Sequence, residues 1–444
     1  MFKTVAPKKG LNSFQVIILG FISLIFVGAL LLCLPISSNS GEWTSFADCV
    51  FTAVSATCVT GLVVLDTATH WSLFGQFIIL IMIQIGGMGV ITVGIALIKL
   101  SGKKIGLLQR NTMQSSISAP QTNDIIKFTG FILKASGITE LAGAVALAPV
   151  FCKDFGFFKG IWYAVWHSVS AFCNAGFDLM GVKSQFSSLT AYSFNGYMNS
   201  VIMILITVGG IGFLVWKDVT TNKFNLKKYS LQSKIVLTTS LILVLLPATY
   251  FFIFEYASEP FKERLFASLF QSVTTRTAGF NTKDLALMSE PGQLLMIFLM
   301  LVGGSPGSTA GGMKTVTLAV LILSAIAVFA RKKDIQCFNR RLPENAVGTA
   351  GAILSIYLTL FLLSGVTISI IEGLPILTCL FETSSAIGTV GLSLGITPSL
   401  SIASKIILMA LMFFGRVGAL TLIYAAVPQT NSNSRLPLEN VAVG

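Results

Sequence analysis

The segment GTVGLSLG at 388–395 has the composition of a loop whose backbone carbonyl oxygens replace the hydration shell of a cation. A single loop supplies only part of such a shell, because the oxygens must surround the ion. Three further segments share its small or polar residues before a glycine and its apolar residue after it: FTAVSATCVTGLVV (51–64), HSVSAFCNAGFDLM (167–180) and QSVTTRTAGFNTKD (271–284). When the four segments are aligned, Gly61, Gly176, Gly279 and Gly391 fall at the same position, and we call them the aligned glycines.

The spacing of the aligned glycines, 115, 103 and 112 residues, indicates an internal fourfold repeat. A second glycine motif follows them after 25, 33, 24 and 24 residues: IGGMG (85–89), VGGIG (208–212), VGGSPG (302–307) and FGRVG (414–418). The repeated order predicts one unit made of a helix, a short re-entrant helix, an extended loop and a second helix. The predicted repeats are 11–100, 124–218, 230–332 and 345–427, followed by a tail at 428–444.

Four extended loops around one axis would form a cation filter. Glycine adopts positive φ without penalty, and the C-terminal end of each re-entrant helix would present negative partial charge to a cation. The alternative, that the glycines only allow close helix packing, explains the fourfold register less well. The predicted filter residues are Cys58, Val59, Thr60, Gly61, Cys173, Asn174, Ala175, Gly176, Arg276, Thr277, Ala278, Gly279, Gly388, Thr389, Val390 and Gly391. We expect the two cysteines to be small packing residues rather than redox groups.

The composition predicts the environment in which these loops lie. Of 444 residues, 54% are hydrophobic and 11% charged, and the mean hydropathy is +0.81. These values predict an all-α polytopic membrane protein whose four tandem helix–pore loop–helix repeats have a pseudo-fourfold, potassium-channel-like arrangement. The first apolar run has the length of a span and no cleavage site, which favours a retained helix over a signal peptide. The apolar runs are 14–34, 73–98, 125–151, 197–216, 235–256, 293–302, 316–330, 345–371 and 402–425.

The net charge of +12 is unevenly distributed along the chain. Lysine and arginine gather at the N-terminus and in the connections 99–127, 217–234 and 331–341, whereas the intervening connections are mixed or acidic. The positive-inside rule therefore predicts eight crossings with both termini in the cytoplasm. Juxtamembrane charge explains the basic composition without nucleic-acid binding. The seven cysteines contain no CxxC pair and form no cluster with the two histidines, so no zinc site or disulfide framework is expected.

The sequence GGSPGSTAGG at 303–312 must interrupt a helix. Proline removes a helix donor and clashes with the preceding turn, and each glycine costs about 1 kcal/mol in a helix interior. A merely kinked helix is the alternative, but one proline would suffice for it, so the ten-residue break favours a gate loop across the pathway. The predicted gate residues are Gly303, Gly304, Ser305, Pro306, Gly307, Ser308, Thr309, Ala310, Gly311 and Gly312, together with Arg416.

Two arginines lie within or beside the apolar runs. Arg416 occupies the position of a glycine in the other three repeats, and an arginine at membrane depth costs at least ~2.5 kcal/mol unless it is paired or hydrated. It could face the axis, repel cations and hold the gate loop through its carbonyls, or form a structural ion pair, for which Glu140 is a candidate. Arg276 precedes Gly279 by three residues, and we expect it behind the filter as a brace with an unidentified acidic partner.

These motifs resemble the Trk/Ktr/HKT superfamily of potassium transporters, most closely the membrane subunit of the bacterial sodium-dependent Ktr system. The resemblance covers nearly the whole chain, including the four loops, FFGRVG and the terminal NVAVG. It implies potassium uptake across the bacterial plasma membrane, an extracellular filter, an intramembrane gate and activation by sodium. It also implies a homodimer, with the tail at its interface, and a cytosolic ring of regulatory subunits that binds ATP or ADP. Glycine at position 61 implies potassium selectivity by the same analogy.

Other classes of protein fit these patterns less well. A secondary carrier for another solute would show inverted repeats, whereas these repeats share one orientation. An enzyme is not expected, because the chain lacks HExxH, GxSxG with a partner histidine and paired intramembrane aspartates. It also lacks GxxxxGK[ST] and a suitably placed GxGxxG, so nucleotide is expected on the partner subunit alone. A Trk-type subunit is the alternative within the superfamily, although the first repeat begins by about residue 13, which favours Ktr.

Overall fold

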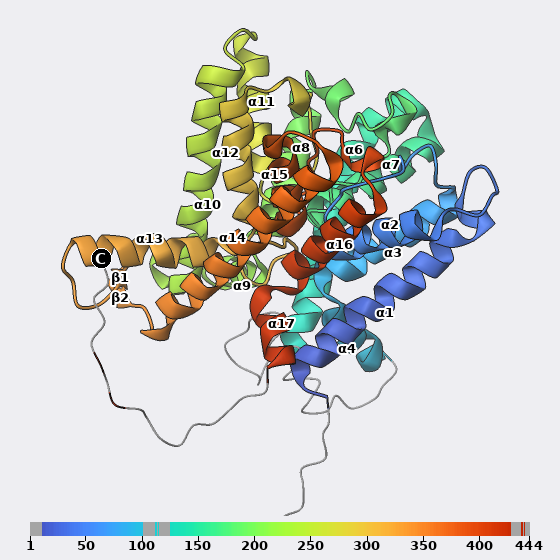
Figure 1. Ribbon diagram of the computed structural model, residues 1–444. Helices are drawn as coiled ribbons and strands as arrows, with labels where there is room; N and C mark the ends of the chain where they lie inside the picture. Colours follow the sequence, from blue (N-terminus) through green and yellow to red (C-terminus); the bar gives the residue numbers. More distant parts are fainter. Residues whose placement is uncertain are drawn as a thin grey trace, which may run out of the picture.

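A computed structural model describes residues 11–100, 112, 114, 125–427, 437 and 439. These residues form a helical body (Figure 1), in which the two-residue strands β1 (Gln336–Cys337) and β2 (Arg340–Arg341) make a small hairpin. The predicted all-α class is therefore confirmed. The basic N-terminal residues, much of the basic connection 99–127, and the tail 428–444 apart from 437 and 439 lie outside the described residues.

Four successive segments repeat the same order of elements. Each has a long first helix, a short helix that ends at an aligned loop, and a second helix that is interrupted. The first segment contains α1 (Ser13–Cys33), α2 (Phe46–Cys58), α3 (Leu73–Met88) and α4 (Val90–Leu100), and the second contains α6 (Ile125–Phe155), α7 (Phe157–Phe172), α8 (Gly196–Gly210) and α9 (Phe213–Asn222). The third contains α10 (Leu231–Tyr250), α11 (Phe261–Thr274), α12 (Glu290–Leu301) and α13 (Thr315–Phe329), and the fourth contains α14 (Asn345–Glu372), α15 (Ile376–Gly388), α16 (Ile402–Val417) and α17 (Ala419–Ala426).

A polar cap starts each second helix as the chain returns from the loop. The cap side chain accepts a hydrogen bond from the amide three residues later, which satisfies one free donor of the first turn. The four caps are Ser72 before α3, Asn195 before α8, Ser289 before α12 and Ser401 before α16. The loops are thus anchored at both ends by helices whose boundaries are set locally.

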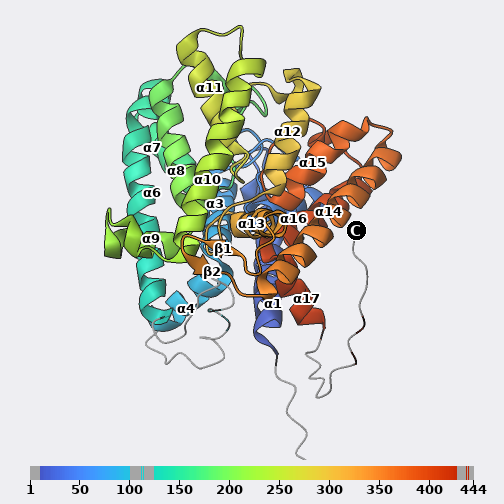
Figure 2. The ribbon, with the colours of Figure 1, turned by 90° about the vertical axis from the view of Figure 1, so that its left-hand side faces the viewer.

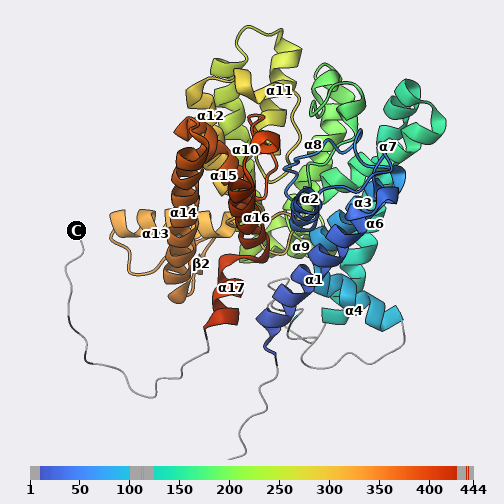
Figure 3. The same ribbon diagram turned by 45° about the vertical axis from the view of Figure 1, so that its right-hand side comes forward.

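The four segments close into a ring. The second helix of each segment contacts the short helix of the next: α3 with α7, α8 with α11, α12 with α15, and α16 with α2. The last of these contacts, between the fourth and first segments, can be followed in Figure 1 and Figure 3. Beyond it, the Asn12 side chain donates to the carbonyl of Tyr424, so that the start of α1 lies beside α17. The arrangement is pseudo-fourfold, as the sequence repeat predicts.

Four described helices are long and apolar enough to cross a membrane, namely α1, α6, α10 and α14. These are the first helices of the four segments. Counting each of the bent pairs α8–α9 and α16–α17 as one span raises the number to six. The eight crossings predicted from the sequence would additionally use the shorter helices α3 and α12, so that number stays a prediction.

Three of the apolar runs that contain the second helices are interrupted in the structure. The runs 73–98, 197–216 and 402–425 each break at the last glycine of the second motif, where φ is 87° at Gly89, 94° at Gly212 and 89° at Gly418. A right-handed helix cannot continue through positive φ. The bend is 97° between α8 and α9 and 93° between α16 and α17. The predicted break at 303–312 separates α12 from α13. Helix α13 runs across the direction of α10 and α12 in Figure 1, and Figure 2 shows it nearly end-on.

Candidate functional site

Each short helix leads into the same unusual backbone turn. Two residues before each aligned glycine the backbone is left-handed, with φ of 58° at Val59, 59° at Asn174, 61° at Thr277 and 51° at Thr389. The aligned glycines also have positive φ, between 69° and 94°. A left-handed residue other than glycine costs on the order of 1–3 kcal/mol, so neighbouring contacts must hold the turn. The sequence pattern located the loops but carried no shared signal for this conformation, because none of the four residues is glycine and only Asn174 is of a type enriched in it.

The aligned glycines meet around a common centre. A Cβ atom placed on any of them would strike the carbonyl oxygen of the residue before the next aligned glycine. The pairs and distances are Gly61 with Ala175 (2.5 Å), Gly176 with Ala278 (2.8 Å), Gly279 with Val390 (2.4 Å) and Gly391 with Thr60 (2.1 Å). The four contacts close a ring in chain order. Only glycine lets the loops approach this closely, and such proximity is what four sets of carbonyl oxygens need to share one ion.

Hydrogen bonds within each segment fix the position of its loop. In three segments the amide before the aligned glycine donates over 2.8 Å to the carbonyl six residues before that glycine: Thr60 to Ser55, Ala175 to Ser170 and Val390 to Ser385. The third segment differs, because Ala278 donates to Thr274 at 2.9 Å. The apolar residues that follow the aligned glycines anchor the loops in the core, with at most 1% of each exposed: Leu62, Phe177, Phe280 and Leu392.

The second glycine motif packs against the ends of the short helices. A Cβ atom on Gly86, Gly209 or Gly415 would lie 1.9–2.1 Å from a carbonyl oxygen of the preceding short helix. That carbonyl belongs in each case to the residue four positions before the aligned glycine: Thr57, Phe172 and Ile387. Close packing of backbones is thus the physical role of this motif, and it brings the two sequence motifs together in space.

A cavity of about 200 Å³ lies on one side of the ring. All four aligned glycines line it, together with the carboxylates of Asp66, Asp178 and Asp284. Negative charge at the mouth of a narrow passage raises the local concentration of cations. Sequence reasoning noted acidic residues in these connections but did not place any of them at the ring.

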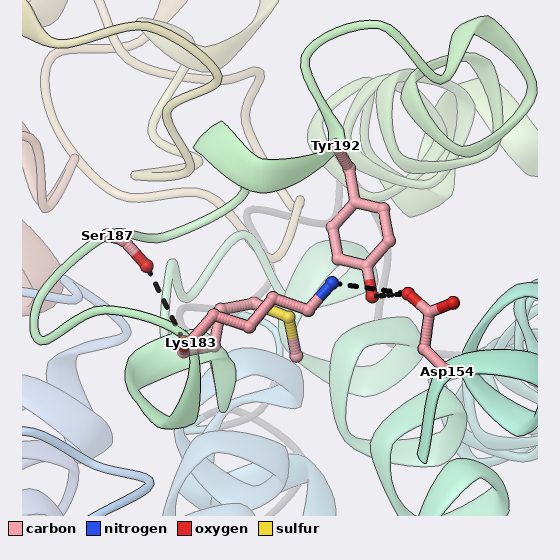
Figure 4. Close-up of polar contacts among 5 residues, drawn as sticks. Asp154, Lys183, Ser187 and Tyr192 are labelled. Carbon is pink, nitrogen blue, oxygen red and sulfur yellow. Dashed lines mark hydrogen bonds and ion pairs between the residues drawn. The ribbon is translucent and has the colours of Figure 1, made fainter. Parts of the chain in front are cut away.

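The connection after α7 crosses this cavity and joins three segments. Its Phe186 amide donates to Asp66 Oδ2 at 3.0 Å, and its Leu189 amide donates to the carbonyl of Asn281 at 3.0 Å. Figure 4 shows how the connection is anchored to the end of α6: Lys183 and the Tyr192 hydroxyl both reach Asp154 Oδ2, at 3.2 Å and 2.6 Å. The ammonium of Lys183 also lies 4.1 Å from the centre of the Tyr192 ring.

The predicted gate loop, residues 303–312, packs against the second motifs of two other segments. The Ser305 amide donates to the Gly210 carbonyl at 3.0 Å, and the Gly312 amide donates to the Gly415 carbonyl at 3.1 Å. The Thr309 hydroxyl reaches the loop before Gly176 in the second segment, donating over 3.0 Å toward Asn174 Oδ1 and the Phe172 carbonyl. The gate loop therefore lies directly against the ring, and a helix that was merely kinked would make none of these contacts.

Arg416 connects the gate loop to the first segment. Its guanidinium donates from Nη1 to the carbonyl of Thr309, and from Nη2 to the carbonyls of Gly86 and, at 2.9 Å, Gly87. The ion pair with Glu140, considered from the sequence, is not formed in the described structure, because the Glu140 carboxylate accepts instead from Gln84 Nε2 at 2.8 and 3.0 Å.

A second cation, Lys314, was missed by the sequence analysis. Its ammonium donates to the carbonyls of Ala310 and Gly311 at 2.8 and 3.4 Å, so that with Arg416 it holds three consecutive carbonyls of the gate loop. Both side chains line a cavity of about 230 Å³, to which the gate loop also contributes. Lys314 follows the glycine-rich stretch by two residues, and in the sequence it resembles an ordinary charged residue at the start of an apolar run.

Arg276, Cys58 and Cys173 have buried side chains. The Arg276 side chain lines an apolar cavity of about 260 Å³ between α8 and α10, and its Nη1 has no hydrogen-bond partner in the described part of the chain. The carboxylate predicted to pair with it is therefore not found among the described residues. Cys58 and Cys173 are buried free thiols.

Comparison with known proteins gives this arrangement a family. The sequence matches the TrkH family, described as cation transport protein, over residues 3–435. The chain belongs to this family. Its TrkH-family relatives include the potassium/sodium uptake protein NtpJ of Enterococcus hirae, 39% identical with 98% of both chains covered. The Ktr system potassium uptake protein B is 38% identical in Bacillus subtilis (97% of this chain and 96% of that protein) and 31% identical in Vibrio alginolyticus (97% and 94%).

The fold agrees with a solved member of the TrkH group. The crystal structure of the potassium transporter TrkH from Vibrio parahaemolyticus superposes with a TM-score of 0.73, at 20% identity, over 96% of this chain and 87% of that chain. The resemblance drawn from the motifs is thus confirmed, as is the polytopic all-α membrane fold. Its family consists of transport proteins, so this TrkH-family chain is not an enzyme.

Proposed function

We propose that this TrkH-family chain is the pore-forming subunit of a potassium uptake system in the bacterial plasma membrane. The closed ring of aligned glycines carries the proposal, because it brings four carbonyl-bearing loops within reach of a single ion. The relatives named for potassium uptake support the choice of ion. In this proposal the sixteen predicted filter residues form the filter, and the four predicted repeats are its four walls.

The gate is the second part of the proposal. Residues 303–312 obstruct the pathway next to the filter, and Arg416 holds them closed. The bonds from Arg416 and Lys314 to three successive gate-loop carbonyls support this role, because they fix a segment that has no helical hydrogen bonds of its own. A cation leaving the filter would also meet these two positive charges.

The remaining parts of the proposal concern regulation and assembly. Sodium activates uptake, both termini are cytoplasmic, and the chain works as a homodimer on a cytosolic ring that binds ATP or ADP. The relatives named as Ktr system proteins support a multi-component system, and the name of NtpJ includes sodium. A gate needs a partner with different affinity for its open and closed states, and this chain has no nucleotide-binding motif of its own.

Growth and uptake in a potassium-auxotrophic bacterium test the core of this proposal. The wild-type chain should restore growth at low potassium, and uptake should prefer potassium to sodium and increase when sodium is present. Gly391→Ser should abolish the preference for potassium, because its side chain would strike the Thr60 carbonyl. Gly351→Ser is the matched control, since a Cβ atom there meets nothing within 4 Å. Wild-type uptake without preference for potassium would overturn the assignment.

A further inference from the structure

The side chains behind the filter follow a twofold pattern within the fourfold repeat. Nine residues before the aligned glycine, the second and fourth segments carry hydrogen-bond acceptors, His167 and Glu382. The corresponding residues of the first and third segments are Thr52 and Phe270. All four lie on the short helices α2, α7, α11 and α15, and His167, Phe270 and Glu382 are fully buried. The Thr52 hydroxyl donates instead to the Asp48 carbonyl of its own helix, at 2.8 Å, so a residue at this position accepts from the outgoing loop only in the two segments that lie opposite each other in the ring.

Glu382 holds the chain as it leaves the fourth filter loop. Its Oε1 accepts from the Leu394 amide at 3.1 Å and from the Ser393 hydroxyl at 2.5 Å. Its Oε2 accepts from the Thr397 hydroxyl at 2.9 Å. A fully buried carboxylate is costly unless it is well hydrogen-bonded, and all three donors belong to the segment that follows Gly391.

His167 makes the equivalent contact in the second segment. Its Nδ1 lies 2.7 Å from the Tyr163 carbonyl, which can only accept, so Nδ1 carries the proton and Nε2 is left as an acceptor. The Leu179 amide donates to Nε2 at 3.4 Å. Leu179 and Leu394 both stand three residues after their aligned glycines, so the two contacts are equivalent by position.

A second pair of contacts repeats the same pairing of segments. Asp178 and Ser393 both stand two residues after an aligned glycine, and each accepts from the amide two residues further on, at 2.8 Å. The first and third segments use a different acceptor, an aspartate five residues after the glycine. Asp66 and Asp284 accept there from the amides of Ala68 and Ala286, at 3.1 and 3.0 Å.

We propose that Glu382 and His167 are positioning residues that set potassium selectivity along one diagonal of the filter. The inference rests on the proposed function. Each residue ties the outgoing limb of its loop to the short helix behind it, and the two limbs lie on opposite sides of the ring. Movement of either limb would change the distance between opposing carbonyl oxygens, and ion selectivity depends on the geometry and number of those oxygens.

Flux ratios in liposomes containing the purified full chain test this role. Glu382→Ala removes all three acceptor contacts and should lower the ratio of potassium to sodium flux by at least about threefold, the effect of one net hydrogen bond. Glu382→Gln should stay within about twofold of wild type, because its carbonyl oxygen can accept from Leu394 and Ser393 while its amide donates to the Thr397 hydroxyl. Glu372→Ala is the matched control, since Glu372 accepts from Ser401 and Ser404 at the start of α16, away from the filter.

His167 is tested in the same way. His167→Phe keeps a ring in the slot that Phe270 fills in the third segment but removes the acceptor, and it should also lower the flux ratio by about threefold. His167→Gln restores a side-chain oxygen and should recover part of that loss. An unchanged flux ratio in Glu382→Ala or His167→Phe would overturn the proposal for that residue. If Glu382→Gln lowered the ratio as much as Glu382→Ala, the negative charge rather than the hydrogen bonds would set selectivity, and the positioning role of Glu382 would be wrong. A wild-type preference for potassium in the same vesicles keeps these outcomes separate from failure of the proposed function.

Discussion

Replacing Arg416 should release the gate loop. The Arg416 guanidinium spans two parts of the protein, because Nη1 bonds to Thr309 in the gate loop whereas Nη2 bonds to Gly86 and Gly87 at the end of α3. In Arg416→Ala the loop loses this tether but keeps its backbone bonds to Gly210 and Gly415 and its contact with Lys314. We therefore expect a protein that folds and conducts more potassium.

The magnitude follows from the single bond that links arginine to the gate loop. A hydrogen bond to a charged group contributes about 1.5–3 kcal/mol. Loss of that bond shifts the equilibrium between the held and the released loop by about 10- to 150-fold, at 1.36 kcal/mol for each factor of ten. Potassium flux should rise by the same factor until the released state predominates, so the measured increase is at most this large.

Potassium efflux from liposomes, normalised to incorporated protein, measures the effect. Arg341→Ala is the control, because Arg341 is an exposed arginine on β2 whose ion pair with Asp334, at 3.7 Å, is remote from the gate loop. Arg416→Lys separates tethering from charge repulsion. A lysine keeps the positive charge but cannot reproduce the planar fork that binds Thr309 and Gly86 together, so tethering predicts an intermediate flux, whereas repulsion alone predicts wild-type flux.

Unchanged flux in Arg416→Ala would contradict the tether. If deletion of 306–308 from the gate loop also left the flux unchanged, at equal incorporation and with both variants monodisperse, the loop would be a structural break rather than a gate.

Three further predictions follow from the same geometry. Gly61→Ser should weaken discrimination against sodium in whole-cell uptake, because the new Cβ would lie 2.5 Å from the Ala175 carbonyl oxygen and position 61 has a φ of 94°. If this variant discriminated as well as the wild type, the ring would tolerate a side chain at this position. Burial raises the pKa of Asp178 to about 7, so acidification of the outer solution from pH 8 to pH 6 should protonate it and raise the KM for potassium. Asp178→Asn, which keeps the acceptor for Met180, should lose this pH response, and persistence of the response would assign it to another group. ATP should raise potassium flux only when the cytosolic subunit is added to the liposomes, and a response of this chain alone would disprove the proposed division of labour.

The four loops that carry the aligned glycines could be found from the sequence because their signal is repeated. One glycine between small and apolar residues is weak evidence, but Gly61, Gly176, Gly279 and Gly391 recur with a second motif in the same order. Composition was equally informative about the membrane, because a soluble protein with so few charges could not cover the apolar surface of so many runs of spanning length. The break at 303–312 was predictable because proline and glycine destabilise a helix locally, whatever surrounds them.

Contacts between distant segments could not be predicted in this way. The left-handed turns at Val59, Thr277 and Thr389 are imposed on residues that do not favour them, and only Asn174 is of a type enriched in this conformation, so local propensity does not indicate the four turns together. The bends at Gly89, Gly212 and Gly418 were missed because glycine is frequent in membrane helices, so its presence does not by itself indicate the positive φ that ends the helix there.

The sequence by itself determined the number of repeats, the positions of the four loops that carry the aligned glycines and the helix break at 303–312, since these depend on the order of residues along the chain. The tertiary structure alone decided that Arg416 binds Thr309 rather than Glu140 and that Lys314 also binds this loop. It alone decided that Glu382 and His167 accept from the amides of Leu394 and Leu179 in opposite segments of the ring. A buried charged or polar group takes whichever partner the fold brings within hydrogen-bond distance, and that partner can lie anywhere in the chain.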